Sequence, residues 1–162
     1  MTISYKNLPD NTRVCVYQCN RTLTSAEVTS IKSQGQEFLL RWSAHGAKLN
    51  ADLEVFYNKF IVLFVDEEQA QASGCSIDKS VRFLKSLEKE FDISLLNRNL
   101  VAYKDGNRII SCTREEFIDK VRGGILNENT ILFNNLVSTK KEFGTKWEVP
   151  LKNSWHYELI GR

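Results

Sequence analysis

The run Phe60-Ile-Val-Leu-Phe-Val65 is the longest uninterrupted apolar stretch in this chain of 162 residues. A strand with one wet face alternates apolar and polar residues, so an unbroken run predicts a strand buried on both faces. Such a strand lies at the centre of a sheet. The run is far shorter than the roughly 20 apolar residues that cross a bilayer. We therefore expect a central strand here and no membrane insertion.

The residues before this run predict its neighbours. Residues 53–57 form a second strand pattern, and the link Asn58-Lys59 is short enough for a β-hairpin. Residues 13–19 predict a further strand. The segment Thr24-Ser-Ala-Glu27 is a capping box that opens an amphipathic helix ending near residue 43, followed by a loop over residues 44–50. Gly35 falls on the apolar stripe of that helix, which indicates close packing against the sheet.

The residues after the run predict a second helix and a second group of strands. Apolar residues at helical spacing extend over residues 81–91. Two strand patterns flank Asp105-Gly106, a strong hairpin signal. The capping box Thr113-Arg-Glu-Glu116 opens a short helix that stops at Gly123-Gly124. Residues 130–133 predict one more strand, and Trp147 and Trp155 are expected to pin the tail to the core.

The order strand, helix, strand, strand, helix, strand matches the start of a ferredoxin-like β-α-β-β-α-β fold. The predicted class is α+β, with a mainly antiparallel sheet, helices on one of its faces and C-terminal additions. The chain contains no repeat, low-complexity tract or linker. We therefore expect a single α+β domain over residues 1–162.

The composition restricts the partners. Lys and Arg number 22 against 20 Asp and Glu, a net charge of +2, which disfavours nucleic acid because phosphate contacts need a concentrated basic face. No signal-peptide pattern opens the chain, so the expected location is cytoplasmic. We expect no metal, no cofactor and no disulfide framework, since none of the cysteines and histidines has metal-ligand spacing: Cys15, Cys19, Cys75, Cys112, His45 and His156.

Residues 66–80 connect the central strand to the second helix and are the strongest candidate site. Gly74 allows the backbone a sharp turn, and Ser76 or Asp78 can act as the helix N-cap. Cys75 would then lie just before the first helical turn, where free backbone N–H groups and the helix dipole stabilise a thiolate. The competing interpretation is a small buried thiol beside an ordinary polar cap.

A nucleophilic thiol also needs a base. His45 is the better-placed candidate for pairing with Cys75, and His156 is the other. A working P-loop is disfavoured, because aligning its Lys-Ser pair with Lys79-Ser80 puts Ser73 and Asp78 where two glycines belong. Asp78 would bring a carboxylate towards phosphate.

Several motifs, taken together, resemble a small bacterial protein family of about this length, whose members often carry the label "ABC transporter ATPase". The resemblance covers nearly the whole chain and implies a cytosolic bacterial protein, but it assigns no catalytic residue. The motifs are Trp42-Ser-Ala-His-Gly46, Val65-Asp-Glu-Glu68, Ser73-Gly-Cys-Ser-Ile-Asp-Lys-Ser80, Phe133-Asn-Asn-Leu-Val137, Trp147-Glu-Val-Pro150 and Ser154-Trp-His156.

Three functions are open at this stage. The first is a non-enzymatic module that binds a small molecule or peptide at the 66–80 junction. The second is a thiol-dependent enzyme that uses Cys75 with His45, and the third is the nucleotide binding that the family label implies. If the motif loops converge, they form a pocket with aromatic walls and polar anchors. Its ligand-binding residues would be Trp42, Asp66, Gly74, Ser76, Asp78, Lys79, Asn134 and His156.

Overall fold

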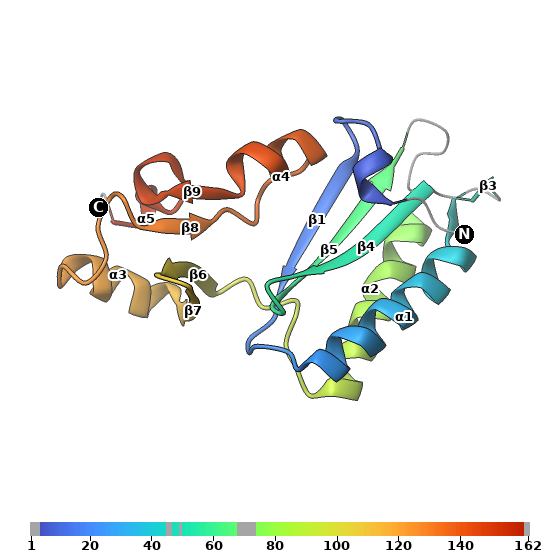
Figure 1. Ribbon diagram of the computed structural model, residues 1–162, viewed down its shortest axis with the longest axis horizontal. Helices are drawn as coiled ribbons and strands as arrows, with labels where there is room; N and C mark the ends of the chain where they lie inside the picture. The colour runs from blue at the N-terminus through green and yellow to red at the C-terminus, as the bar shows by residue number, and fades with distance from the viewer. Residues whose placement is uncertain (1–3, 45–46, 49, 68–73, 161–162) are drawn as a thin grey trace.

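The computed structural model describes residues 4–44, 47–48, 50–67 and 74–160 (Figure 1). Within these residues the chain forms a three-stranded and a four-stranded antiparallel sheet, a short two-stranded ribbon and five α-helices. The predicted α+β class with mainly antiparallel strands is confirmed.

The first sheet is built around the long apolar run. Its order is β1 (Arg13–Gln18), β5 (Phe60–Asp66) and β4 (Asn50–Phe56), with both neighbours antiparallel to β5. Every residue of β5 is buried. The prediction of a central strand covered on both faces is therefore confirmed.

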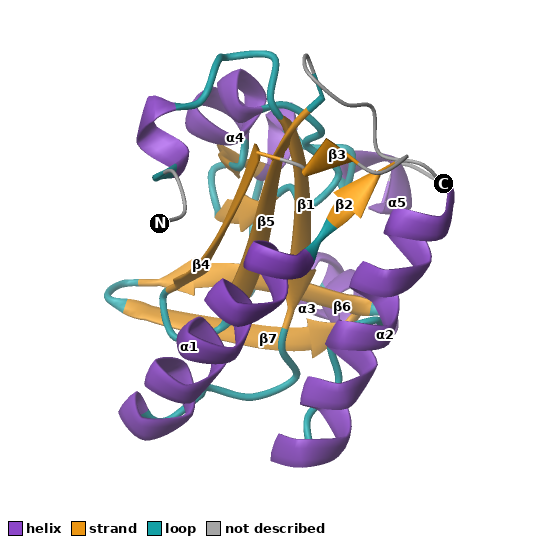
Figure 2. Cartoon of the chain, turned by 90° about the vertical axis from the view of Figure 1, so that its right-hand side faces the viewer, coloured by secondary structure: helices purple, strands orange, loops and turns teal. Residues whose placement is uncertain are grey.

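Two helices cover one face of this sheet. In Figure 2, α1 (Ser25–Arg41) and α2 (Gly74–Phe91) lie side by side in front of its strands. The predicted capping box opens α1: the Glu27 N–H donates to Thr24 Oγ1 at 3.1 Å, and the Thr24 N–H donates to Glu27 Oε1 at 2.9 Å. The expected loop after α1 instead contains a short antiparallel pair, β2 (Ser43–Ala44) and β3 (Ala47–Lys48).

Gly35 packs closely against the sheet, as its place on the apolar stripe predicted. A Cβ added at Gly35 would lie 3.0 Å from Leu53 Cδ2 on β4, and Leu53 is itself buried. We expect Gly35→Val to lower the free energy of unfolding by about 1–3 kcal/mol, because overpacking outweighs the small gain in helix propensity. The measurement is urea denaturation of both proteins.

Gly144 provides the matched control for this prediction. It lies in α4 (Lys140–Lys146), and a Cβ there would meet nothing within 4 Å. Gly144→Val should change the free energy of unfolding by less than about 0.5 kcal/mol. Equal effects at the two glycines would contradict the close approach of α1 to β4.

The turn between β4 and β5 differs from the predicted link. Positive φ falls on Tyr57 (54°) and Asn58 (53°), one residue earlier than Asn58-Lys59. A positive φ is costly for tyrosine, and contacts with distant residues offset that cost. The Tyr57 hydroxyl donates to Glu148 Oε2 at 2.8 Å, and its ring lies 5.6 Å from that of Phe133.

The second sheet uses the rest of the chain. Its strand order is β7-β6-β8-β9. The predicted hairpin is present, with Gly106 at φ 62°, and the capping box of Thr113 and Glu116 opens α3. The predicted stop is confirmed too, because Gly123 caps α3. The elements are β6 (Leu100–Asp105), β7 (Arg108–Thr113), α3 (Arg114–Arg122), β8 (Ile131–Phe133), β9 (Glu148–Pro150) and α5 (Tyr157–Ile160).

The first five elements of the predicted ferredoxin-like order are arranged as in that fold, but the sixth element, β6, is not. In that fold the fourth strand of the pattern would lie beside β1, but β6 pairs with β7 and β8 instead. The outer edge of β1 is partly taken by another segment: the Val14 N–H donates to the Ser138 carbonyl at 2.9 Å, and Arg13 forms a bridge with Thr139. The tight hairpin meanwhile gives β6 a local partner in β7.

The second half of the chain covers the face of the first sheet that the helices leave open (Figure 1). Trp147 lies at the centre of this contact, 3% exposed, and was expected to pin the tail to the core. Its ring centroid lies 5.0 Å from Phe60 on β5, 5.0 Å from Phe133 on β8 and 4.6 Å from Phe143 on α4. One aromatic core therefore joins the two sheets.

Candidate functional site

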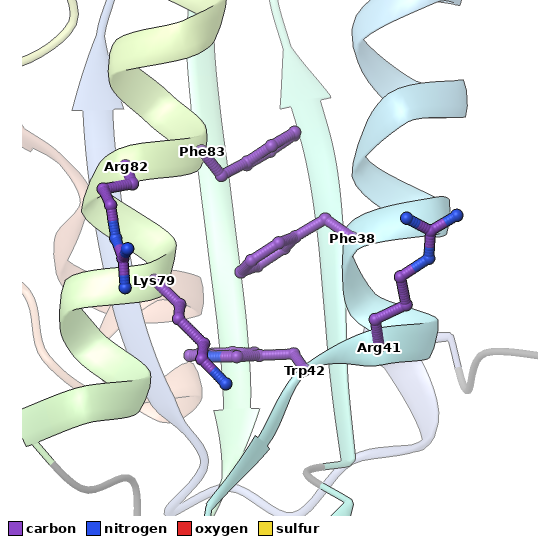
Figure 3. A pocket seen from close by; sticks show the side chains of 6 residues that line it. All are labelled: Phe38, Arg41, Trp42, Lys79, Arg82 and Phe83. Atoms are coloured by element: carbon purple, nitrogen blue, oxygen red, sulfur yellow. The ribbon is translucent and has the colours of Figure 1, made fainter.

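An open pocket of about 470 Å³ lies between the end of α1 and the first half of α2 (Figure 3). We call it the α1–α2 groove. Three aromatic and three cationic residues line it: Phe38, Arg41, Trp42, Lys79, Arg82 and Phe83.

The floor of the groove is aromatic. The Phe38 and Phe83 rings stack with centroids 4.6 Å apart and planes 4° apart, so they join α1 to α2. Trp42 follows with its centroid 5.4 Å from that of Phe38, and it is only 1% exposed. In Figure 3 the three rings succeed one another along the groove. This fixed floor offers van der Waals contact and leaves half-buried apolar surface on the two phenylalanines.

The rim of the groove is positively charged. Arg41 ends α1, while Lys79 and Arg82 lie three residues apart on α2, and all three side chains are exposed. Among the residues that the structure describes, no acidic side chain pairs with any of the three. The lining residues that the structure describes include no acidic side chain either. The arrangement favours an anionic ligand.

The start of α2 differs from the prediction. The helix begins at Gly74, so Cys75 and Ser76 belong to its first turn and Asp78 lies further inside it. Neither Ser76 nor Asp78 is therefore the N-cap, and Cys75 does not precede the helix. The structure does not describe the side chains of Cys75, Ser76 and Ile77.

The two candidate bases for Cys75 have different outcomes. His45 lies outside the described residues, so its pairing with Cys75 stays a prediction. His156 immediately precedes α5, at the opposite end of the molecule from α2 (Figure 1), and is no partner for Cys75.

His156 is a core residue. It is 2% exposed, its Nδ1 is hydrogen-bonded to Ser154 Oγ at 2.6 Å, and its ring stacks on Trp155 at 4.1 Å. Burial, and secondly the charge of Arg114, lower its pKa to about 4. The imidazole is therefore neutral near neutral pH and serves packing.

Asn134 is also structural. Its Oδ1 accepts a hydrogen bond from the Leu136 N–H at 3.1 Å, which makes a tight turn. The next residue, Asn135, accepts from Trp147 Nε1 at 2.9 Å and donates to Gln18 at 3.0 Å. Asn134 and Asn135 together therefore connect β1, the turn and the aromatic core.

The structure brings only part of the predicted site together. Trp42 and Lys79 meet in the groove, whereas Asp66 is buried at the end of β5, and Asn134 and His156 lie in the other half of the fold. Asn134 and His156 therefore do not converge with Trp42 and Lys79, because both serve packing in the second half of the fold.

Sequence reasoning missed four groove residues, Phe38 among them because its spacing assigned it to the core. One signal was present in the sequence, since Arg41 is followed directly by Trp42 and Arg82 directly by Phe83. The missed residues are Phe38, Arg41, Arg82 and Phe83.

Other candidate functional sites on the described part of the protein have less support. A second pocket of about 430 Å³ lies beside the β6–β7 turn, but Lys104 there pairs with Glu148, and the Tyr103 hydroxyl accepts from Lys120 at 2.8 Å. In the part of the chain that the structure describes, no group of three or more His, Cys, Asp or Glu gathers that could hold a metal ion. None of the described helices is long and apolar enough to span a membrane.

The fold and the groove define an α+β protein with an open cationic and aromatic pocket between two helices. In comparisons with known proteins, no family model, no curated protein and no solved structure matches the chain.

Proposed function

We propose that this protein is a non-enzymatic binding module that holds a small organic anion in the α1–α2 groove. The observation that carries the proposal is a rim of three cations, without acidic partners among the described residues, above an aromatic floor. The groove includes Lys79 from the predicted 66–80 junction and extends the site to the end of α1.

Two further features support binding of a small molecule. The groove volume of about 470 Å³ falls within the usual range of small-ligand pockets, about 300–1,000 Å³. The chain as a whole carries a net charge of only +2, so three cations without an acidic partner among the described residues are a local feature rather than a general basic surface.

We favour binding over catalysis because the described residues that line the groove include no cysteine, serine, carboxylate or histidine. The thiol-dependent alternative rests on Cys75, which lies four residues before Lys79 on α2. It is tested alongside the main proposal with Cys75→Ser, which a binding module should tolerate with unchanged ligand affinity.

The experiment is a thermal-shift screen of organic anions against neutral and cationic analogues. Bound ligand at a hundred times its Kd should raise Tm by about 5–10 °C, because it stabilises only the folded state. Arg82→Glu should weaken binding about tenfold or more, since it places a carboxylate on the rim.

The matched control is Lys85→Glu, the same charge change on an exposed residue of α2 that does not line the groove. It should change the affinity less than about twofold, as expected for a screened surface charge. A screen in which no anion raises Tm, or equal losses in the two variants, would refute the proposed function.

A further inference from the structure

We infer that the ligand is an amphipathic anion, with an apolar aryl or acyl body and one anionic end group. This inference rests on the proposed function and names the chemical class that the groove selects. It also separates two kinds of organic anion: those with an apolar body, and nucleotides or sugar phosphates with many polar groups.

The floor determines what body fits. Phe38 and Phe83 present half-buried aromatic surface beside the buried Trp42, and none of the described lining side chains is a hydrogen-bond acceptor of the amide, hydroxyl or carboxylate kind. Sugar hydroxyls and the amino groups of bases donate hydrogen bonds, so on this floor they would lose water without gaining a partner. An apolar body has no hydrogen bonds with water to lose on this floor, and it covers the apolar surface of the two half-buried phenylalanines.

The rim determines where the charge lies. Lys79 and Arg82 share one wall of the groove, and in Figure 3 the Lys79 side chain ends beside the Trp42 indole, at one end of the row of rings. An anionic group held there leaves the rest of the ligand to extend along Phe38 and Phe83. Carboxylate and phosphate both match an arginine fork, so the body and not the head group makes the distinction.

The test is isothermal titration of the full-length protein with straight-chain carboxylates from butanoate to octanoate. Affinity should rise about fourfold for each added methylene, as expected for a CH₂ group that leaves water. AMP and ribose 5-phosphate should bind at least about tenfold more weakly than octanoate, and octyl phosphate should bind comparably to it.

Two variants test which residues contact the apolar body of the ligand and which contact its anionic end group. Phe83→Leu keeps an apolar side chain, so the protein should still fold. It should reduce the increase in affinity for each added methylene, and the ligand should still need an anionic group. Arg82→Gln should weaken all chain lengths by a similar factor, about fivefold, with the gain per methylene unchanged. Lys85→Gln is the control and should match the wild type in both respects.

The failures of the two proposals are distinguishable. If AMP or ribose 5-phosphate binds more tightly than octanoate, and Arg82→Gln weakens it, the amphipathic ligand is refuted and the anion-binding groove stands. Affinity that does not change with chain length also refutes the amphipathic ligand. If no anion binds at all, both proposals fail together.

Discussion

Trp147→Ala is expected to lower the free energy of unfolding by about 3–5 kcal/mol, the usual cost of removing a buried indole. The side chain is 3% exposed and contacts Phe60 of the first sheet and Phe133 of the second. Its Nε1 also donates to Asn135, whose own amide holds Gln18 on β1. The substitution therefore opens a cavity and removes the hydrogen-bond donor that orients Asn135.

Chemical denaturation monitored by circular dichroism measures this effect. Trp147→Phe retains the ring packing but not the N–H, and should cost about 1–3 kcal/mol. Leu136→Ala, at a side chain 65% exposed, is the control and should stay within about 0.5 kcal/mol. Because the aromatic core includes residues from both sheets, one unfolding transition is expected, as for a single domain over residues 1–162. Two separate transitions, or a Trp147→Ala cost no larger than that of Leu136→Ala, would contradict this account of the core.

Acidification below pH 6.5 is expected to destabilise the fold through His156. Its pKa is lowered from 6.5 to about 4, first by burial and then by Arg114. Between these two values the unfolded chain takes up a proton that the folded protein does not. The stabilisation is therefore fully present above about pH 6.5 and is lost as the pH falls to about 4, in total about 3 kcal/mol.

The check is the free energy of unfolding of wild type and His156→Asn between pH 7 and pH 4.5. The variant should be less stable at pH 7, because it leaves a gap beside Trp155 and Phe117, but it should lose much less stability on acidification. The pKa of Glu27 is also lowered, to about 2, by hydrogen bonds from Arg21 and Thr24, so its stabilisation is lost only below about pH 4.5. Equal pH dependence in the two proteins would rule out His156 as the cause.

The local parts of the fold could be read from the sequence because each depends on residues close together in the chain. The Thr24 and Thr113 capping boxes need partners only three residues away, and both form. Gly106 supplies the positive φ of its hairpin without help from the rest of the protein. The unbroken apolar run likewise identified β5 as buried on both faces. The turn at Tyr57 escaped prediction because contacts with Glu148 and Phe133, far along the chain, stabilise its backbone.

The candidate site was only partly predictable for the same reason. Trp42 and Lys79 were identified from their motifs, but the groove also needs Phe38 and Phe83 to stack across two helices. Asn134 and His156 lie in similar sequence motifs, but Asn134 stabilises a turn and His156 is a buried core residue. Polar and aromatic residues serve packing as readily as binding, and sequence spacing does not distinguish the two uses.

The sequence by itself determined the α+β class, the central strand, the helix starts at the two capping boxes and the close approach at Gly35. Hydrophobic periodicity and capping are short-range effects, so a few neighbouring residues suffice for them. Only the tertiary structure decided that β6 belongs to a second sheet, that Trp147 joins the two sheets, and that α1 and α2 flank an open cationic groove. These outcomes depend on which strand edges and helix faces meet, and that competition between distant surfaces is resolved only when the whole chain packs.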